Sequence, residues 1–121
     1  MALNPPNTKY RVNRTAKLDA AAGAAAAVTL TSEGSDRVMV VDQIVWSFDR
    51  ALTVASSLTI ASPSATELFK IDIPIAAAGT PPGPNSIVFD QGFEGAVGED
   101  VVITLAGTAD AEIGKLNVLY H

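Results

Sequence analysis

The sequence predicts an all-β protein: a single antiparallel β-sandwich of about eight strands, arranged as a jelly roll. Its 121 residues are the usual length of one domain. Apolar residues make up 48% of the chain and are mostly Ala, Val, Ile and Leu, which pack well on a pleated sheet. Short runs of alternating apolar and polar residues recur between turn-forming residues, and no long helical period separates them. An immunoglobulin-like sandwich is the alternative, because periodicity does not encode how the strands connect.

The first eighteen residues are predicted to form an extended basic arm, followed by the sandwich domain over residues 19–121. The arm has four basic and no acidic side chains, whereas the rest of the chain has four basic and thirteen acidic ones. Pro5 and Pro6 favour an extended backbone. The segment has too little apolar mass to fold alone, so it is either a loose tail or becomes ordered by lying across its own body or a neighbouring subunit. The side chains expected to contact that partner are Met1, Leu3, Pro5, Pro6, Lys9, Tyr10, Arg11, Arg14 and Lys17.

The segment after the arm has weaker signals. Residues 20–27 read AAAGAAAA and allow one or two helical turns, which Gly23 weakens. Residues 10–18 and 52–55 are the weaker strand candidates.

The longest strand is predicted over residues 38–48. Asp42 interrupts its apolar face, which predicts a β-bulge near Asp42 and Gln43. The buried face of this strand is expected to carry Val38, Val40, Ile44, Trp46 and Phe48.

Further strands follow from the same period of two, with turns at glycine, proline and aspartate clusters between them. Phe69, Ile71, Ile73 and Ile75 alternate with Lys70, Asp72 and Pro74, and similar runs cover residues 58–60, 87–89, 101–105 and 115–120.

The chain offers little catalytic equipment, and we expect it not to be an enzyme. It contains no cysteine, and its single histidine, His121, is the last residue, where we expect a solvated end. Gly92, Gly95 and Gly98 precede a strand rather than a helix and lack the lysine of a phosphate loop, so they indicate backbone positions with positive φ. No cofactor is expected.

No metal site is expected either. Acidic residues gather near two loops without the spacing of a calcium loop. These residues are Glu94, Glu99, Asp100, Asp110 and Glu112.

Nucleic acid and membrane are not expected as partners. The net charge is −5, and the acidic body would repel phosphate groups. No stretch approaches the about 18 apolar residues that cross a bilayer.

Parts of the sequence resemble small accessory proteins of tailed-bacteriophage virions. The resemblance covers residues 38–121 and lies in VVDQIVWSFDRALTVASSLTI, in LFKIDIPI followed by a proline-glycine loop, and in the final GKLNVLYH. Such proteins are short jelly-roll or related β-sandwiches that cement or decorate the capsid, commonly as dimers or trimers with arms crossing to neighbouring subunits. The resemblance implies the same role here. The chain would be made in the host cytoplasm, lie on the capsid surface and bind the major capsid protein or another virion protein.

A carbohydrate- or receptor-binding module of a phage tail or virion surface is the alternative function. Such a module often presents an exposed aromatic side chain to a sugar ring. Trp46 is the only tryptophan, and its register with Ile44 and Phe48 predicts that it lies in the core. The exposure of this side chain therefore discriminates between the two functions.

Overall fold

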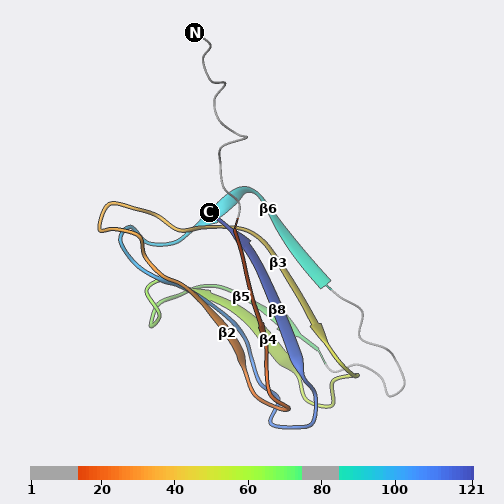
Figure 1. Cartoon of the computed structure of the whole chain (residues 1–121). Helices are drawn as coiled ribbons and strands as arrows, with labels where there is room; N and C mark the ends of the chain where they lie inside the picture. Colours follow the sequence, from red (N-terminus) through yellow and green to blue (C-terminus); the bar gives the residue numbers. More distant parts are fainter. Residues whose placement is uncertain (1–13, 75–84) are drawn as a thin grey trace.

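The computed structural model describes residues 14–74 and 85–121, and within these ranges the chain forms eight strands (Figure 1). The strands are β1 (Arg14–Asp19), β2 (Ala26–Leu30), β3 (Val40–Phe48), β4 (Ser56–Ala61), β5 (Glu67–Ile73), β6 (Asn85–Glu94), β7 (Val101–Leu105) and β8 (Gly114–Tyr120).

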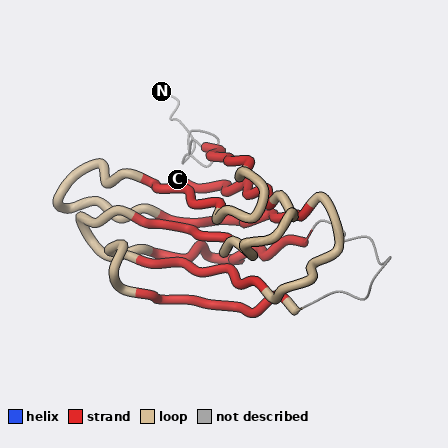
Figure 2. Tube along the Cα trace, turned by 90° about the horizontal axis from the view of Figure 1, so that it is seen from below, coloured by secondary structure: helices blue, strands red, loops and turns tan. Residues whose placement is uncertain are grey.

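The strands form two four-stranded antiparallel sheets. One sheet has the order β1-β8-β3-β6 and the other β2-β7-β4-β5. Figure 2 shows the two sheets as stacked layers. Except for the β4–β5 hairpin, each strand is followed along the chain by a strand of the opposite sheet. This order is that of a jelly roll, so the predicted fold class is confirmed.

The core is the space between the sheets, and alternating side chains of both sheets fill it. Residues of β2, β3, β4, β7 and β8 that point inward are almost fully buried, and their neighbours along each strand are more exposed. The core side chains in these strands are Ala26, Val28, Leu30, Val41, Ile44, Trp46, Phe48, Leu58, Ile60, Val101, Ile103, Leu105, Leu116 and Val118. Their burial is the main favourable contribution to folding.

The bulge predicted in the longest strand is present. The register of β3 with β8 shifts between Val41 and Gln43, where Asp42 is the extra residue. At the same place the register with β6 also shifts, but there the extra residues belong to β6. The shift changes which side chains point inward before the bulge. Val41 is fully buried and Val40 only partly, so the prediction that Val40 lies on the buried face was wrong by one residue.

Two predictions of local structure were wrong, one for residues 20–27 and one for residues 52–55. The alanine-rich segment forms a turn and then β2, because Ala26, Val28 and Leu30 alternate with exposed residues and pair with β7. Residues 52–55 form no strand. Leu52 is instead a buried loop residue whose side chain joins the core.

The arm is shorter than predicted in the described part of the chain. Arg14–Leu18 belong to β1, which pairs with β8 from Arg14 opposite Tyr120 to Asp19 opposite Lys115. The alternation of the segment explains this, since Ala16 packs against the core while Thr15 and Lys17 are exposed. Residues 1–13, with the other predicted contact residues, lie outside the described residues.

We expect Leu58→Ala to lower the free energy of unfolding by about 2–5 kcal/mol, because Leu58 is fully buried at the centre of the core. The matched control is Leu68→Ala in the neighbouring strand, where the side chain is 45% exposed and the same change should cost less than about 0.5 kcal/mol. Urea unfolding followed by tryptophan fluorescence measures both values. Equal effects at the two positions would contradict this assignment of the core.

Candidate interaction surface

The sandwich has two lateral edges, and the edge formed by β1 and β2 is closed. Arg14 at the start of β1 donates from Nη1 and Nη2 to Oε2 and Oε1 of Glu33, which follows β2, at 2.6 and 3.1 Å. The guanidinium also lies over the ring of Tyr120, 4.8 Å from its centroid. The hydrogen bonds from Arg14 lower the pKa of the Glu33 carboxyl. This side-chain pair thus joins the two sheets across their shared edge.

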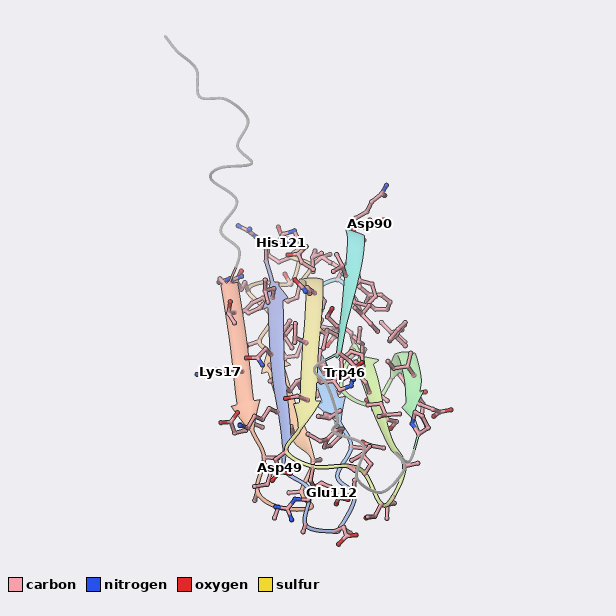
Figure 3. All side chains as sticks on the ribbon, turned by 90° about the vertical axis from the view of Figure 1, so that its right-hand side faces the viewer. Lys17, Trp46, Asp49, Asp90, Glu112 and His121 are labelled. Atoms are coloured by element: carbon pink, nitrogen blue, oxygen red, sulfur yellow. The ribbon has the colours of Figure 1, made fainter. Side chains whose placement is uncertain are left out.

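Arg14 and Lys17 are therefore placed differently from the prediction that both contact a partner. Arg14 is engaged within its own chain by Glu33 and Tyr120. Lys17 is exposed on β1 and points away from the sandwich (Figure 3). Its availability to a neighbouring subunit stays a prediction.

The opposite edge, formed by β5 and β6, is more open. These strands lie at corresponding ends of the two sheets. Their inward side chains pack against the core but are only partly buried, unlike the inward side chains of the central strands. We call these side chains the apolar strip: Phe69, Ile71 and Ile73 of β5, and Ile87, Phe89 and Phe93 of β6.

Three phenylalanines hold the two strands of the apolar strip together. The ring centroids of Phe69 and Phe89 are 5.7 Å apart, those of Phe69 and Phe93 5.8 Å, and those of Phe89 and Phe93 5.3 Å. The two contacts across the edge are edge-to-face, a favourable arrangement for aromatic rings. The edge is therefore joined by side-chain contacts between two strands that are each the last of their sheet.

An irregularity of β6 brings two of these phenylalanines to the same place. Val41 of β3 is opposite Phe93, but Gln43 is opposite Val88, so residues 89–92 of β6 face the single bulged residue Asp42. Gly92 in this excursion has φ of 79°, and a Cβ there would lie 2.3 Å from a methyl group of Val40. Four positions of a regular strand span about 13 Å, whereas the excursion of the backbone brings the ring centroids of Phe89 and Phe93 to 5.3 Å from each other.

The end of the sandwich beside this excursion is also ordered by His121. Its Nδ1 lies 2.7 Å from Oδ2 of Asp42, and its backbone exchanges two 2.9 Å hydrogen bonds with Val40. The expectation of a solvated end was therefore wrong for this residue. Figure 3 shows His121 and Asp90 at the same end of the molecule.

The outer faces of β5 and β6 are mainly acidic. They carry Glu67, Asp72, Asp90 and Glu94, with Lys70 as their one basic residue. All five residues are exposed. The apolar strip is thus bordered by a net charge of −3, a combination that suits a partner with both apolar and basic groups.

Three of the acidic residues considered as cation ligands, Asp100, Asp110 and Glu112, bind protein groups. Glu112 is buried and accepts hydrogen bonds from the amide of Thr53 at 2.9 Å, the hydroxyl of Thr53 at 2.8 Å and the hydroxyl of Thr108 at 2.9 Å. Asp100 accepts from the amide of Ser32 at 2.7 Å. Within residues 14–74 and 85–121, no three His, Cys, Asp or Glu side chains gather in a way that could hold a metal ion.

The pKa of Glu112 is lowered to about 2, chiefly by the hydrogen bond from the backbone of Thr53 and then by its own amide and the two hydroxyls. At the same end, the amide of Ile113 donates to Asp49 at 2.8 Å and lowers the pKa of that carboxyl. Figure 3 shows both carboxylates at the end opposite His121. They fix the loops between strands there, which is a structural role.

Trp46 lies in the core, as predicted, and is 6% exposed. Its side chain belongs to the core cluster between the two sheets. Its Nε1 has no hydrogen-bond partner among the described residues. A buried indole cannot serve as a platform for stacking on a sugar ring.

Sequence reasoning identified the strands of the apolar strip and missed the strip as a surface. The alternation of Phe69, Ile71 and Ile73 is the same whether a strand is central or at an edge. The signal that distinguishes the two is the position of β5 and β6 in the sheets, which depends on the connections.

No protein-family model matches the sequence, and the comparison with curated proteins gives no match. Among solved structures, the fold is similar to a chain from a study of the appendages of Bacillus endospores, described as a novel family of disulfide-linked pili. The identity is 20% and the TM-score 0.44, with 90% of this chain and 84% of that chain covered. The present chain has no cysteine. In the described ranges, no helix has the length and apolar character needed to cross a membrane.

Iodide should quench the fluorescence of Trp46 only weakly in the folded protein, because its indole is buried between the sheets. The urea-unfolded chain is the control and should be quenched several-fold more strongly. Strong quenching under native conditions would place the side chain on the surface and favour a binding platform.

We expect Glu112→Gln to destabilise the protein at neutral pH. The folded-state pKa of about 2 lies below the ordinary value of 4.5, so the carboxylate stabilises the fold fully above the ordinary value. This contribution is lost as the pH falls from 4.5 toward 2. The difference between wild type and variant should therefore be constant near neutrality and shrink below pH 4.5.

Urea unfolding at a series of pH values measures this difference, with Glu99→Gln as an exposed control. A difference that stays constant between neutral pH and the acid limit would show that the charge of Glu112 contributes nothing.

Proposed function

We propose that the protein is a structural component of a phage virion, a decoration or cement protein that contacts neighbouring subunits through its N-terminal arm and its sandwich surface. The observation that carries this proposal is the apolar strip, a row of partly exposed Phe and Ile side chains on an otherwise well-closed sandwich. An apolar surface rimmed by charged residues is typical of a protein–protein interface.

The charge distribution supports the same role. Residues 1–13 carry Lys9 and Arg11 and no acid, whereas the body of the chain is acidic. A basic segment can pair with acidic neighbours while its Met1, Leu3 and Tyr10 side chains enter apolar sites. A cement protein needs such separate contacts, because one subunit must hold at least two others.

The strength of cementing would come from repetition. Several modest contacts around a symmetric position of a shell combine into high avidity, because each contact raises the effective concentration for the next. A deep pocket is not required for this role. A small sandwich with the apolar strip at one edge and a separate N-terminal segment offers two such contacts. It would bind as a dimer or trimer on the shell surface.

Removal of residues 1–13 should leave a folded sandwich that no longer binds capsids, because β1 begins only at Arg14. Removal of residues 1–18 should also destabilise the fold, since it deletes nearly all of β1 and uncovers the edge of β8. Co-sedimentation with empty phage shells lacking the protein, together with the temperature at which those shells open, measures binding and cementing.

Circular dichroism of each truncated chain is the control for folding. Full-affinity decoration by the chain lacking residues 1–13 would overturn the role of the arm. Absence of shell binding by the full-length chain would overturn the decoration role itself.

A further inference from the structure

We propose that the apolar strip is the binding site for residues 1–13 of a second copy of the chain, so that subunits join head to tail. This inference rests on the proposed function and names the contact between neighbouring subunits. It follows from three features of the described residues. These are the partly exposed edge between β5 and β6, the charge around this edge, and the position of β1 at the far side of the sheet that contains β6.

The charge around the apolar strip disfavours a symmetric dimer in which the strips of two copies pack against each other. In such a dimer the border of each copy, with four acidic residues and Lys70, would face the same border of the other copy. Like net charges placed across an interface oppose binding. A partner for this edge should therefore be apolar and basic, and the acidic body of the chain does not meet that description.

Residues 1–13 do meet it. They contain Lys9 and Arg11 without any acid, and they supply Met1, Leu3, Tyr10 and Val12 as apolar side chains. Lys9-Tyr10-Arg11-Val12 alternates basic and apolar residues. In an extended segment, one face can therefore enter the strip while the other meets the acidic border. β5 and β6 are the last strands of their sheets, and an extended segment can bind at such a position by β-strand addition.

The geometry of the sheet favours a second copy over the same molecule. β1 and β6 are the two outer strands of one sheet, so the segment leaves at one edge and the apolar strip lies at the other. Each copy can thus give one segment and receive one, which is a heterologous contact. Length alone does not decide between the two, because thirteen extended residues span about 43–47 Å and the four strands of the sheet only about 14 Å. Residues 7–13 contain no Gly or Pro that would turn the segment back across its own sheet.

Site-directed crosslinking tests this contact directly, because the chain has no native cysteine. Chains carrying Thr8→Cys are mixed with tagged chains carrying Val88→Cys, an exposed position on β6, and treated with a short bis-maleimide. The control mixture replaces the second variant by Thr29→Cys, an exposed position on β2 at the opposite edge. We expect several-fold more mixed dimer with Val88→Cys than with Thr29→Cys.

Charge reversal then identifies the interaction. Lys9→Glu with Arg11→Glu in the Thr8→Cys chain should remove most of the mixed dimer. Asp72→Lys with Asp90→Lys in the Val88→Cys chain should restore it. Rescue by the second pair is a result that general loss of folding cannot produce.

Three outcomes overturn the inference. These are equal crosslinking at both edges, no rescue by charge reversal, and efficient crosslinking within a dilute single chain carrying both Thr8→Cys and Val88→Cys, which would place the segment on its own strip. The measurement uses isolated protein, so its failure leaves shell binding unaffected and is distinguishable from failure of the proposed function.

Discussion

The structure depends on burying the inward faces of two sheets against each other, and the bulge at Asp42 is what allows β3 to take part along its whole length. A strand without an extra residue would place Val41 and Ile44 on opposite faces, because they are three positions apart. With Asp42 inserted, both are fully buried. Opposite Asp42, residues 89–92 of β6 have no paired residue in β3, and this excursion brings the rings of Phe89 and Phe93 together at the edge. The core and the candidate surface therefore meet at one irregularity of the sheet.

The two edges of the sandwich differ because different side chains close them. At one edge, small residues such as Ala16 and Ala26 let β1 and β2 approach, and the Arg14–Glu33 pair joins the sheets outside them. At the other edge, bulky phenylalanines fill the gap between β5 and β6 from within and remain partly exposed. An exposed edge with apolar side chains is an aggregation hazard that soluble proteins normally cover or charge. The acidic border provides the charge, while the side chains of the apolar strip stay partly exposed.

The fold class could be predicted from the sequence because a period of two is a local property that most of the strands retain. β2 was missed because alanine has no strong preference visible in the pattern, and its assignment depends on pairing with β7, about seventy-five residues away. Arg14 was placed in the arm for the same reason, since its partner Glu33 is distant in the sequence. The apolar strip could not be predicted, because whether a strand is central or at an edge is decided by strand order.

The candidate interaction surface also depends on both local sequence and strand order. Charge composition already separates a basic N-terminal segment from an acidic body, but composition alone does not say which part of the body is the complement. The structure narrows the choice, since β5 and β6 combine four exposed carboxylates with six partly buried apolar side chains. In the proposed contact, long-range electrostatic attraction would guide association toward this surface, and burial of Phe and Ile side chains would supply most of the binding free energy. A segment that provides only charge would be displaced by salt, whereas one that also fills the apolar strip would remain bound.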